Sequence, residues 1–391
     1  MTQRKKICIV TGTRAEYGLL SGLMRELQQA QDFDLQVLAC AAHLSEQHGM
    51  TVNQILADGF RVDARVAMLD AGQDTTVEVA RSVGRGVQGM AEAFDVLQPD
   101  LVFVLGDRYE ILAAAQAALL MHIPLAHIHG GELTHGAVDD AIRHAISKMA
   151  NLHFVAAEPY RQRLIQMGEA PDSVFNVGAP GLDVIQNTSL LSEEVLSHML
   201  DFKLTHPLLL VTYHPVTWGS QAGIDAVENV FSALEKFDDA CIVWTAPNAD
   251  PQGVELYRKI EAWVARGSVK AKLFTSLGTQ GYLSCLSAAD AVIGNSSSGI
   301  IEAPTIGTPT VNIGTRQDGR LRARSVIDCD ESFESIVSAL NKALSESMKQ
   351  CAAEKHSVYG KGDTAKAILA ILRETDWSLL KNKMFYDFPL L

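Results

Sequence analysis

The sequence is short of three features that would point to other classes of protein. Its apolar runs fall below the roughly 18–20 residues that cross a membrane, and its first residues lead into an apolar segment with no signal-peptide cleavage pattern. Basic residues are scarce, because 33 Lys and Arg stand against 46 Asp and Glu. The net charge of −13 disfavours a general nucleic-acid or anionic-membrane binder. We therefore expect a cytoplasmic protein with neither nucleic acid nor membrane as a partner.

Cysteine is the third scarce feature. The six cysteines are scattered, none forms a CxxC pair, and two of them, Cys8 and Cys241, lie inside apolar segments. This distribution is typical of reduced, buried thiols and argues against a zinc site or a disulfide framework. No other constellation of metal ligands is visible, so neither a metal nor a cofactor is predicted. An anionic ligand would then need its counter-charges from individual arginines.

Apolar segments of strand length alternate with helical patterns along the whole chain. With 391 residues and 47% hydrophobic content, the chain is long enough to bury two separate cores. A more polar stretch over 183–206 ends at Pro207, after which the alternation starts again. The pattern predicts an α/β protein of two Rossmann-like domains that face each other across a cleft.

Ionisable residues gather at the ends of two predicted strands, 101–105 and 124–128. Asp107 follows the first strand together with Arg108, and Glu132 follows the second. The carboxyl ends of parallel strands form one edge of a sheet, where ligands bind in open α/β folds. A structural role in the turn after the strand would explain Asp107 taken alone.

Two histidines also belong to this edge. His127 and His129 point to the same side of the second strand. Either histidine could be a satisfied structural residue instead of a functional one, and the sequence leaves both interpretations open for each.

A helix that opens near Asp139 adds a third group. Asp140 is three residues before Arg143 and four before His144, so their side chains can share one face of the first turns. A lone aspartate there would be an N-cap or a partner of the helix dipole. Carboxylates and histidines concentrated in this way are unusual on a solvated surface, so the stretch favours an acid/base site.

The best candidate for a phosphate site is the segment Gly294-Asn295-Ser296-Ser297-Ser298-Gly299, which precedes a helix expected from Ile300. Backbone N–H groups and serine hydroxyls at a helix N-terminus bind anionic oxygens without a buried cation. The segment lacks the lysine of a Walker loop, which disfavours nucleoside-triphosphate hydrolysis. A serine-rich N-cap is the structural alternative. Glu302, in the first turn of the expected helix, could contact a polyol such as ribose.

Single polar residues at other strand ends extend this picture. His214, Asn248 and Arg316 each follow a predicted strand of the second half, and Arg14 lies in the turn before a helix expected from Leu19. Arginine supplies a fixed positive charge that suits phosphate. The residues alone therefore predict an enzyme acting on a nucleotide-linked or otherwise phosphorylated substrate. Its diphosphate would bind to the second domain, and the acid/base groups would lie on the first.

Taken together, these segments resemble the UDP-N-acetylglucosamine 2-epimerase family, and specifically its hydrolysing branch in sialic and legionaminic acid synthesis. The matching motifs are Thr11-Gly12-Thr13-Arg14-Ala15-Glu16-Tyr17-Gly18, Gly106-Asp107-Arg108-Tyr109-Glu110, His127-Ile128-His129-Gly130-Gly131-Glu132, Asp139-Asp140-Ala141-Ile142-Arg143-His144, His214-Pro215, Gly294-Asn295-Ser296-Ser297-Ser298-Gly299-Ile300-Ile301-Glu302 and Gly314-Thr315-Arg316-Gln317. The resemblance implies the glycosyltransferase-B type of fold and a homodimer or homotetramer. Residues 1–185 would form the first domain, 186–370 the UDP-binding domain, and 371–391 a tail that packs back on the first.

One departure separates the branches of this family. The non-hydrolysing branch has a HxEAGxR motif where this chain reads His127-Ile128-His129-Gly130-Gly131-Glu132. Reversible epimerisation of the intact nucleotide sugar is therefore disfavoured, and the product should be released as free sugar.

The reaction that the resemblance implies begins when UDP leaves C1 of UDP-N-acetylglucosamine by anti elimination, which gives a 2-acetamidoglucal. Addition of water then gives N-acetylmannosamine. The C2 proton has no adjacent carbonyl to acidify it, so departure of UDP must develop positive charge first. General acid/base catalysis contributes only about 10²–10⁴-fold to the rate of a reaction. Stabilisation of the diphosphate therefore has to supply much of the remaining rate enhancement.

The resemblance also implies roles for the matching positions. The catalytic set would be Asp107, Glu132, Asp140, His144 and His214. The UDP site would be Arg14, His214, Asn248, Ser296, Ser297, Ser298, Gly299, Glu302 and Arg316, with Glu302 on the ribose. Which carboxylate removes the C2 proton and which delivers water stays open.

Three alternatives remain beside this interpretation. The same reaction on UDP-2,4-diacetamido-2,4,6-trideoxyglucose, the legionaminic acid branch, would use the same motifs, because they contact UDP, C1 and C2. A glycosyltransferase of the same fold would need an acceptor site, which is not evident. A nucleotide-sugar-binding regulator without activity would have lost carboxylates, whereas Asp107, Glu132 and Asp140 are all present.

Overall fold

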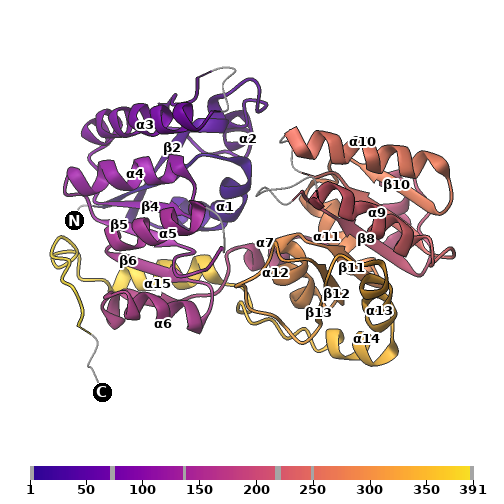
Figure 1. Ribbon diagram of the computed structural model, residues 1–391. Helices are drawn as coiled ribbons and strands as arrows, with labels where there is room; N and C mark the ends of the chain where they lie inside the picture. Colours follow the sequence, from indigo (N-terminus) through magenta and orange to yellow (C-terminus); the bar gives the residue numbers. More distant parts are fainter. Residues whose placement is uncertain (1–3, 71–74, 135–137, 216–221, 248–250, 388–391) are drawn as a thin grey trace. The chain divides into compact units, whose positions relative to one another are not determined.

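The computed structural model describes residues 4–70, 75–134, 138–215, 222–247 and 251–387 (Figure 1). Contacts within the chain divide it into two compact units, one made by Met1–Val184 with Gly362–Leu391 and the other by Ile185–Lys361. The breaks expected from the sequence lie at 185/186 and 370/371, whereas the contacts group residues 362–370 with the first unit.

The first unit is built on a seven-stranded parallel sheet with the order β3-β2-β1-β4-β5-β6-β7. Its strands are β1 (Lys5–Thr11), β2 (Phe33–Cys40), β3 (Ala64–Val66), β4 (Leu101–Leu105), β5 (Leu125–Ile128), β6 (Leu152–Val155) and β7 (Val174–Asn176). Its helices are α1 (Arg14–Gln29), α2 (Val52–Ala57), α3 (Thr76–Leu97), α4 (Tyr109–Leu120), α5 (Val138–Met149), α6 (Glu158–Gln166) and α15 (Thr364–Glu374), and α7 (Gly181–Asn187) crosses the break between the units. Short 3₁₀ turns lie at Ala41–Leu44 and Pro171–Ser173.

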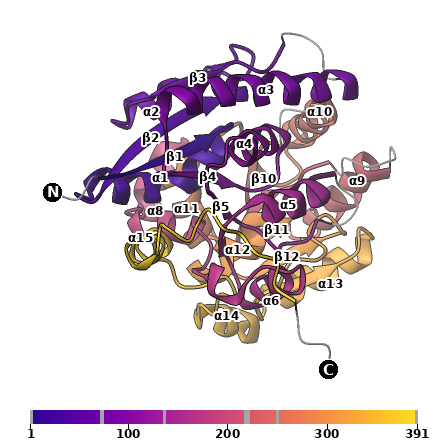
Figure 2. The same cartoon turned by 90° about the vertical axis from the view of Figure 1, so that its left-hand side faces the viewer.

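β1 illustrates why helices cover both faces of this sheet. Ile7 and Ile9 join the core formed with α1, α2 and α15, whereas Cys8 and Val10 join the core beneath α3, α4 and α5. Successive side chains of a strand point to opposite faces, so a continuous apolar run is stable only between two layers of helix. Neighbouring contacts link α3 to α4 and α4 to α5 across the second face (Figure 2).

α1 begins earlier than the sequence pattern indicated. The helix expected from Leu19 starts at Arg14, because Thr13 is its N-cap and forms a capping box with Glu16. The Thr13 side chain accepts from the Glu16 N–H, and the Glu16 carboxylate accepts from the Thr13 N–H in return. Arg14 is therefore the first helical residue, and its side chain is exposed.

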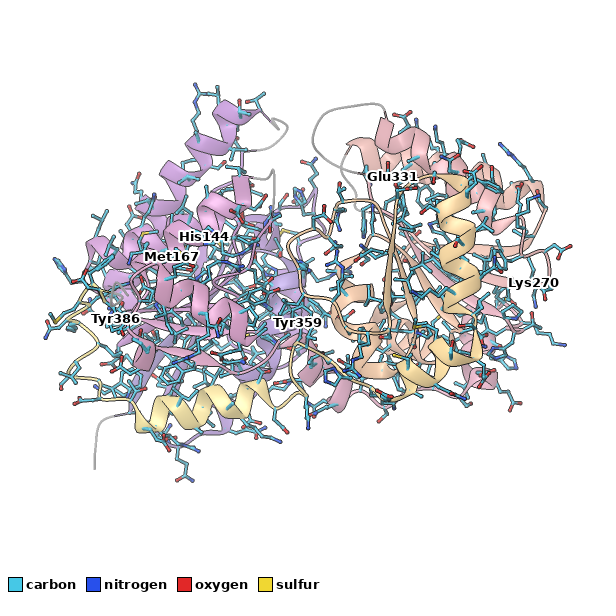
Figure 3. All side chains as sticks on the ribbon, turned by 60° about the horizontal axis from the view of Figure 1, so that its bottom comes forward. His144, Met167, Lys270, Glu331, Tyr359 and Tyr386 are labelled. Atoms are coloured by element: carbon cyan, nitrogen blue, oxygen red, sulfur yellow. The ribbon has the colours of Figure 1, made fainter. Side chains whose placement is uncertain are left out.

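The C-terminal residues pack on the first unit. The Asp183 carboxylate accepts from the backbone N–H groups of Thr364 at 2.8 Å and Ala365 at 2.7 Å, which caps the start of α15. Beyond α15, the Tyr386 N–H donates to the carbonyl of Gly168 at 3.0 Å. Figure 3 labels Tyr386 close to Met167, the residue before Gly168. The chain end therefore contacts the loop after α6.

The second unit contains a six-stranded parallel sheet with the order β10-β9-β8-β11-β12-β13. Its strands are β8 (Leu208–Thr212), β9 (Cys241–Thr245), β10 (Lys270–Phe274), β11 (Ala291–Gly294), β12 (Thr310–Ile313) and β13 (Val326–Cys329). Its helices are α8 (Glu193–Leu200), α9 (Ala222–Leu234), α10 (Pro251–Arg266), α11 (Gly278–Ala288), α12 (Ser297–Ile306), α13 (Phe333–Ala343) and α14 (Glu346–Ala353). Phe231 of α9 stacks on Trp263 of α10 at 5.0 Å between ring centroids, inside the core that covers one face of this sheet. Throughout the described residues, every helix is too short or too polar to cross a membrane.

Candidate active site

The strand order creates a topological switch point between β1 and β4 in the first unit. The sheet continues through β2 and β3 on one side of β1, and through β5, β6 and β7 on the far side of β4. Gly12 follows β1, and Gly106 and Asp107 follow β4. Ligands of open α/β sheets bind at such a point. Asp107 therefore occupies the position that this fold favours for a substrate.

Asp107 is held by a cation from α5. Nη2 of Arg143 donates to Oδ2 of Asp107, and the Arg143 side chain is 4% exposed against 22% for that of Asp107. A charge-assisted hydrogen bond from a buried guanidinium is strong and directional. It orients the Asp107 carboxylate.

Asp140 and His144 form a second pair on α5. Oδ1 of Asp140 accepts from the Thr134 N–H at 2.7 Å, and Nε2 of His144 lies 3.5 Å from Oδ2 of Asp140. Nη1 of Arg143 is 3.9 Å from Oδ1 of the same aspartate, so the face predicted from the residue spacing is present. Burial lowers the pKa of His144, with Asp140 opposing and Arg143 reinforcing the shift. His144, labelled in Figure 3, is therefore neutral at neutral pH.

His127 is a structural histidine. It is fully buried, and its Nε2 lies 2.8 Å from the carbonyl oxygen of Gly106. Because a carbonyl can only accept, Nε2 carries the proton and Nδ1 accepts from the Ser147 hydroxyl at 3.0 Å. Burial lowers the pKa of His127 to about 3. The side chain links the end of β4 to α5 and has both nitrogens engaged.

His129 and Glu132 form a close pair after β5. Nδ1 of His129 lies 2.5 Å from Oε1 of Glu132, and their side chains are 14% and 5% exposed. The loop between them is held by Arg163 of α6, which donates to the carbonyl of Gly131. His129 was left undecided by the sequence and is absent from the predicted site, although its place at a strand end was a usable signal.

Two buried carboxylates lie behind the turn that follows β1. Oε2 of Glu16 accepts from the Gly12 N–H at 2.8 Å, and a Cβ on Gly12 would lie 2.6 Å from Cγ of Glu110. Glu110 is fully buried and accepts from Nε of Arg108 at 2.5 Å. Burial and the neighbouring Glu110 raise the pKa of Glu16 to about 8. Sequence reasoning placed neither carboxylate in the site, since a helix-start glutamate is common.

The second unit has its own switch point, between β8 and β11. The side-chain amide of Asn295 bridges the two strand ends, because its Oδ1 accepts from the His214 N–H at 2.7 Å and its Nδ2 donates to the His214 carbonyl at 2.8 Å. Gly294, before it, has a φ of +133°, and a Cβ there would lie 1.9 Å from the Thr212 carbonyl oxygen. Only glycine fits, so the two loops are held at close approach.

The predicted phosphate segment leads into α12. Ser296 is its N-cap, and its hydroxyl accepts from the Ser298 N–H, so the structural alternative holds for this serine. The same geometry leaves the N-terminus of α12 at the strand edge, where anions are favoured. Ser298 also accepts from the Tyr282 hydroxyl at 2.7 Å. Because the helix begins at Ser297 and not at Ile300, the expectation that Glu302 lies in its first turn is wrong.

The remaining predicted residues of this unit surround the same strand ends. Nη1 of Arg316 donates to the carbonyl of Asn295 at 3.0 Å. Burial, reinforced by Arg316, lowers the pKa of His214 to about 4. Burial raises the pKa of Glu302, against a hydrogen bond with Ser298. Asn248 lies outside the described residues.

The structure thus gathers the predicted residues separately in each unit. In the first unit, Arg143 lies close to both Asp107 and Asp140, and His144 lies close to Asp140. Glu132 pairs with His129. Arg14 is the first residue of α1. Among the described residues, His, Cys, Asp and Glu side chains make no group of three or more that could hold a metal ion.

Comparison with known proteins gives consistent results for this architecture. The family model described as UDP-N-acetylglucosamine 2-epimerase matches residues 25–373. The chain is 43% identical over 340 residues to the GDP/UDP-N,N'-diacetylbacillosamine 2-epimerase (hydrolyzing) of Campylobacter jejuni, covering 86% of this chain and 88% of that protein. It is 36% identical to the UDP-N,N'-diacetylbacillosamine 2-epimerase (hydrolyzing) of Legionella pneumophila, covering 94% and 96%.

More distant similarity extends over nearly the full length. A UDP-N-acetylglucosamine 2-epimerase of Neisseria meningitidis is 30% identical, covering 99% of this chain and 100% of that protein. The crystal structure of UDP-GlcNAc 2-epimerase from Neisseria meningitidis bound to UDP-GlcNAc superposes with a TM-score of 0.82 at 18% identity, covering 95% of this chain and 100% of that one. The predicted α/β fold of the glycosyltransferase-B type, with two Rossmann-like domains, is confirmed.

Proposed function

The chain belongs to the UDP-N-acetylglucosamine 2-epimerase family, and we propose that it is a hydrolysing 2-epimerase of a UDP-linked 2-acetamido sugar. We take UDP-N,N'-diacetylbacillosamine, the 2,4-diacetamido-2,4,6-trideoxyglucose nucleotide, as the substrate. The observation that carries this choice is the 43% identity to the Campylobacter jejuni enzyme of that name. The sequence alone ranked UDP-N-acetylglucosamine first, and the 43% and 36% identities to enzymes named for diacetylbacillosamine support the opposite order.

The reaction proceeds in two balanced steps. First, a group of the site takes the proton from C2, the C2–H electron pair forms the C1=C2 double bond, and UDP leaves C1 with the electrons of the C1–O bond. Second, water bonds to C1 through its oxygen and gives one proton to a group of the site. C2 receives a proton on the face opposite to the one that lost its proton. The products are UDP and the free 2,4-diacetamido-2,4,6-trideoxymannose. Each step needs a proton-transferring group and stabilisation of the departing diphosphate.

The second unit is proposed to bind UDP. The N-terminus of α12 supplies N–H groups and the hydroxyls of Ser297 and Ser298 for the diphosphate, and Arg316 supplies a fixed charge. Neutral His214 would donate a hydrogen bond and gain charge as the phosphate approaches. Glu302, whose pKa is raised by burial, would contact the ribose.

The first unit is proposed to carry the proton transfers. Asp107 is oriented by Arg143, and Asp140 is held by the Thr134 N–H and His144, so both carboxylates keep defined directions at the carboxyl edge of the sheet. Groups held in this way need little reorganisation when charge develops in the transition state. Arg14 is proposed as a further contact to the diphosphate.

Proton NMR in D₂O tests the proposal directly. Purified protein is incubated with UDP-N,N'-diacetylbacillosamine, with its GDP counterpart and with UDP-N-acetylglucosamine. We expect free diacetamido-trideoxymannose carrying deuterium at C2, together with UDP. Nucleotide sugar that is epimerised but not cleaved would refute the hydrolytic step, and absence of turnover on all three would refute the function.

UDP-N-acetylglucosamine is the second candidate, favoured by the 30% identity to the Neisseria meningitidis enzyme over the full chain. Faster release of N-acetylmannosamine than of the diacetamido sugar would select it. In either case, Asp107→Asn should abolish turnover while UDP still binds by calorimetry. Loss of UDP binding in the folded variant would move Asp107 to the nucleotide site.

A further inference from the structure

His129 has an unusual backbone conformation. It lies one residue beyond β5, and its φ of +65° is in the left-handed region that non-glycine residues rarely adopt. Its N–H donates to the Phe154 carbonyl at 3.1 Å, and the next two residues are packed glycines. A Cβ on Gly131 would lie 2.5 Å from the Tyr160 carbonyl oxygen. The surroundings therefore impose this conformation, and strain of this kind gathers at functional sites.

The pairing with Glu132 determines which ring nitrogen of His129 is basic. A carboxylate only accepts hydrogen bonds, so Nδ1, at 2.5 Å from Oε1 of Glu132, carries the ring proton. Nε2 of the neutral ring then holds a lone pair. No hydrogen bond to Nε2 is recorded from the part of the chain that the structure describes. The arrangement matches that of a general base whose tautomer is set by a carboxylate.

The neighbouring carboxylates are less suited to removing a proton. Asp107 is bound by the buried guanidinium of Arg143, and Asp140 accepts from the Thr134 N–H. These hydrogen bonds occupy Oδ2 of Asp107 and Oδ1 of Asp140, so one oxygen of each carboxylate is already engaged. His129 lies at the same edge. The Gly106 N–H donates to the Ile128 carbonyl at 3.0 Å, so the residue before His129 lies beside the residue before Asp107.

We propose that His129 removes the C2 proton of the UDP-sugar and that Glu132 is its positioning residue, with no contact to the substrate. The inference rests on the proposed function and changes the role predicted for Glu132. Nε2 takes the C2 proton while the C1=C2 bond forms and UDP leaves with the C1–O electrons. The imidazolium is stabilised by Glu132 through Nδ1–H.

Chemical rescue tests this role. His129→Gly removes the imidazole and suits the backbone, because glycine adopts a positive φ without strain. His122→Gly is the matched control, since His122 is exposed and has a φ of +56°. We expect kcat of His129→Gly to fall by at least about 10²-fold, with UDP affinity unchanged and with partial recovery in added imidazole. His122→Gly should match the wild type.

A second measurement does not depend on turnover. In ¹⁵N-histidine NMR, the signal missing from His129→Gly identifies His129, and we expect it to show a protonated Nδ1 and a bare Nε2. Glu132→Gln should redistribute the proton between the nitrogens and lower kcat with KM unchanged.

Two results would overturn the inference: kcat of His129→Gly within tenfold of wild type, or a neutral ring protonated on Nε2 in the wild type. Wild-type turnover is measured first, and its absence would refute the proposed function. The NMR measurement of the His129 tautomer would still test the pairing of His129 with Glu132 in that case.

Discussion

Replacing Lys383 with methionine should loosen the end of α5, the helix that carries Asp140 and Arg143. Nζ of Lys383 lies 2.6 Å from Oε2 of Glu169 and donates to the carbonyls of Lys148 at 2.8 Å and Ala150 at 2.5 Å. The side chain thus caps the C-terminus of the helix with a positive charge and pairs with a carboxylate that is 1% exposed. A residue near the chain end therefore holds an element of the candidate site.

The expected loss of stability in Lys383→Met depends on the partners that Glu169 keeps. Breaking a buried ion pair costs about 3–5 kcal/mol when one charge is left without a partner. Glu169 keeps Lys148 at 2.6 Å and His153 at 2.9 Å, so the loss should be smaller. Loss of the helix-terminus charge adds roughly 0.3–1 kcal/mol. Although burial raises the pKa of Glu169, its hydrogen-bond partners lower it to about 2, so the carboxylate stays charged at neutral pH. We expect a total near 2 kcal/mol.

Amide hydrogen exchange measures this cost locally. A decrease of about 2 kcal/mol in the free energy of opening corresponds to roughly 30-fold faster exchange at the last turn of α5. Lys383→Met should also lower kcat without changing UDP affinity, since the UDP site is proposed on the other unit. Lys381→Met, at an exposed position, is the control. Exchange within threefold of wild type at residues 146–150 would show that the reasoning about this contact is wrong.

Three further predictions concern nucleotide binding and metal dependence. Because burial holds the pKa of His214 at about 4 and a bound diphosphate would raise it, UDP binding should take up a proton. UDP affinity should therefore increase as the pH falls from 7 to 5, and calorimetry of His214→Gln should show no such dependence. Asn295→Asp places two acceptors against each other at the His214 carbonyl. The unsatisfied buried groups should cost about 1–3 kcal/mol, and calorimetry should show UDP binding weakened about fivefold or more. Activity should survive treatment with EDTA. Loss of activity in EDTA, with recovery on addition of a divalent ion, would contradict the prediction that no metal is needed.

Short-range spacing predicted part of the arrangement of the candidate residues in the first unit. Asp140, Arg143 and His144 share a face because residues three and four apart in a helix are neighbours, and the structure has these contacts. The place of Asp107 after a strand could be predicted because the apolar run before it has the length of a strand. Both inferences depend only on local periodicity, which is the property that a single sequence carries most directly.

Helix starts and long-range contacts were harder to predict. Ile300 was taken as the start of α12, although the N-cap is Ser296, and this error misplaced Glu302 by one turn. Either start satisfied the serine-rich pattern, so the sequence did not distinguish them. The contact of Lys383 with Glu169 joins residues far apart in the chain and has no local signature. Tertiary packing decides such pairs.

His127 in β5 and His129 just beyond it differ in the roles that their surroundings allow. His127 lies within the strand, where the sheet brings the Gly106 carbonyl and Ser147 to its two nitrogens. With both nitrogens engaged and its pKa lowered to about 3 by burial, the His127 ring is neutral at neutral pH. His129 lies just past the last strand residue, where the packed backbone has a positive φ and Nδ1 pairs with Glu132, and we propose that Nε2 acts as the base. The sequence places both histidines on one side of the strand, and the positive φ of His129 and the different side-chain partners separate them. A polar residue one position beyond a buried parallel strand is therefore a better candidate for chemistry than an identical residue within it.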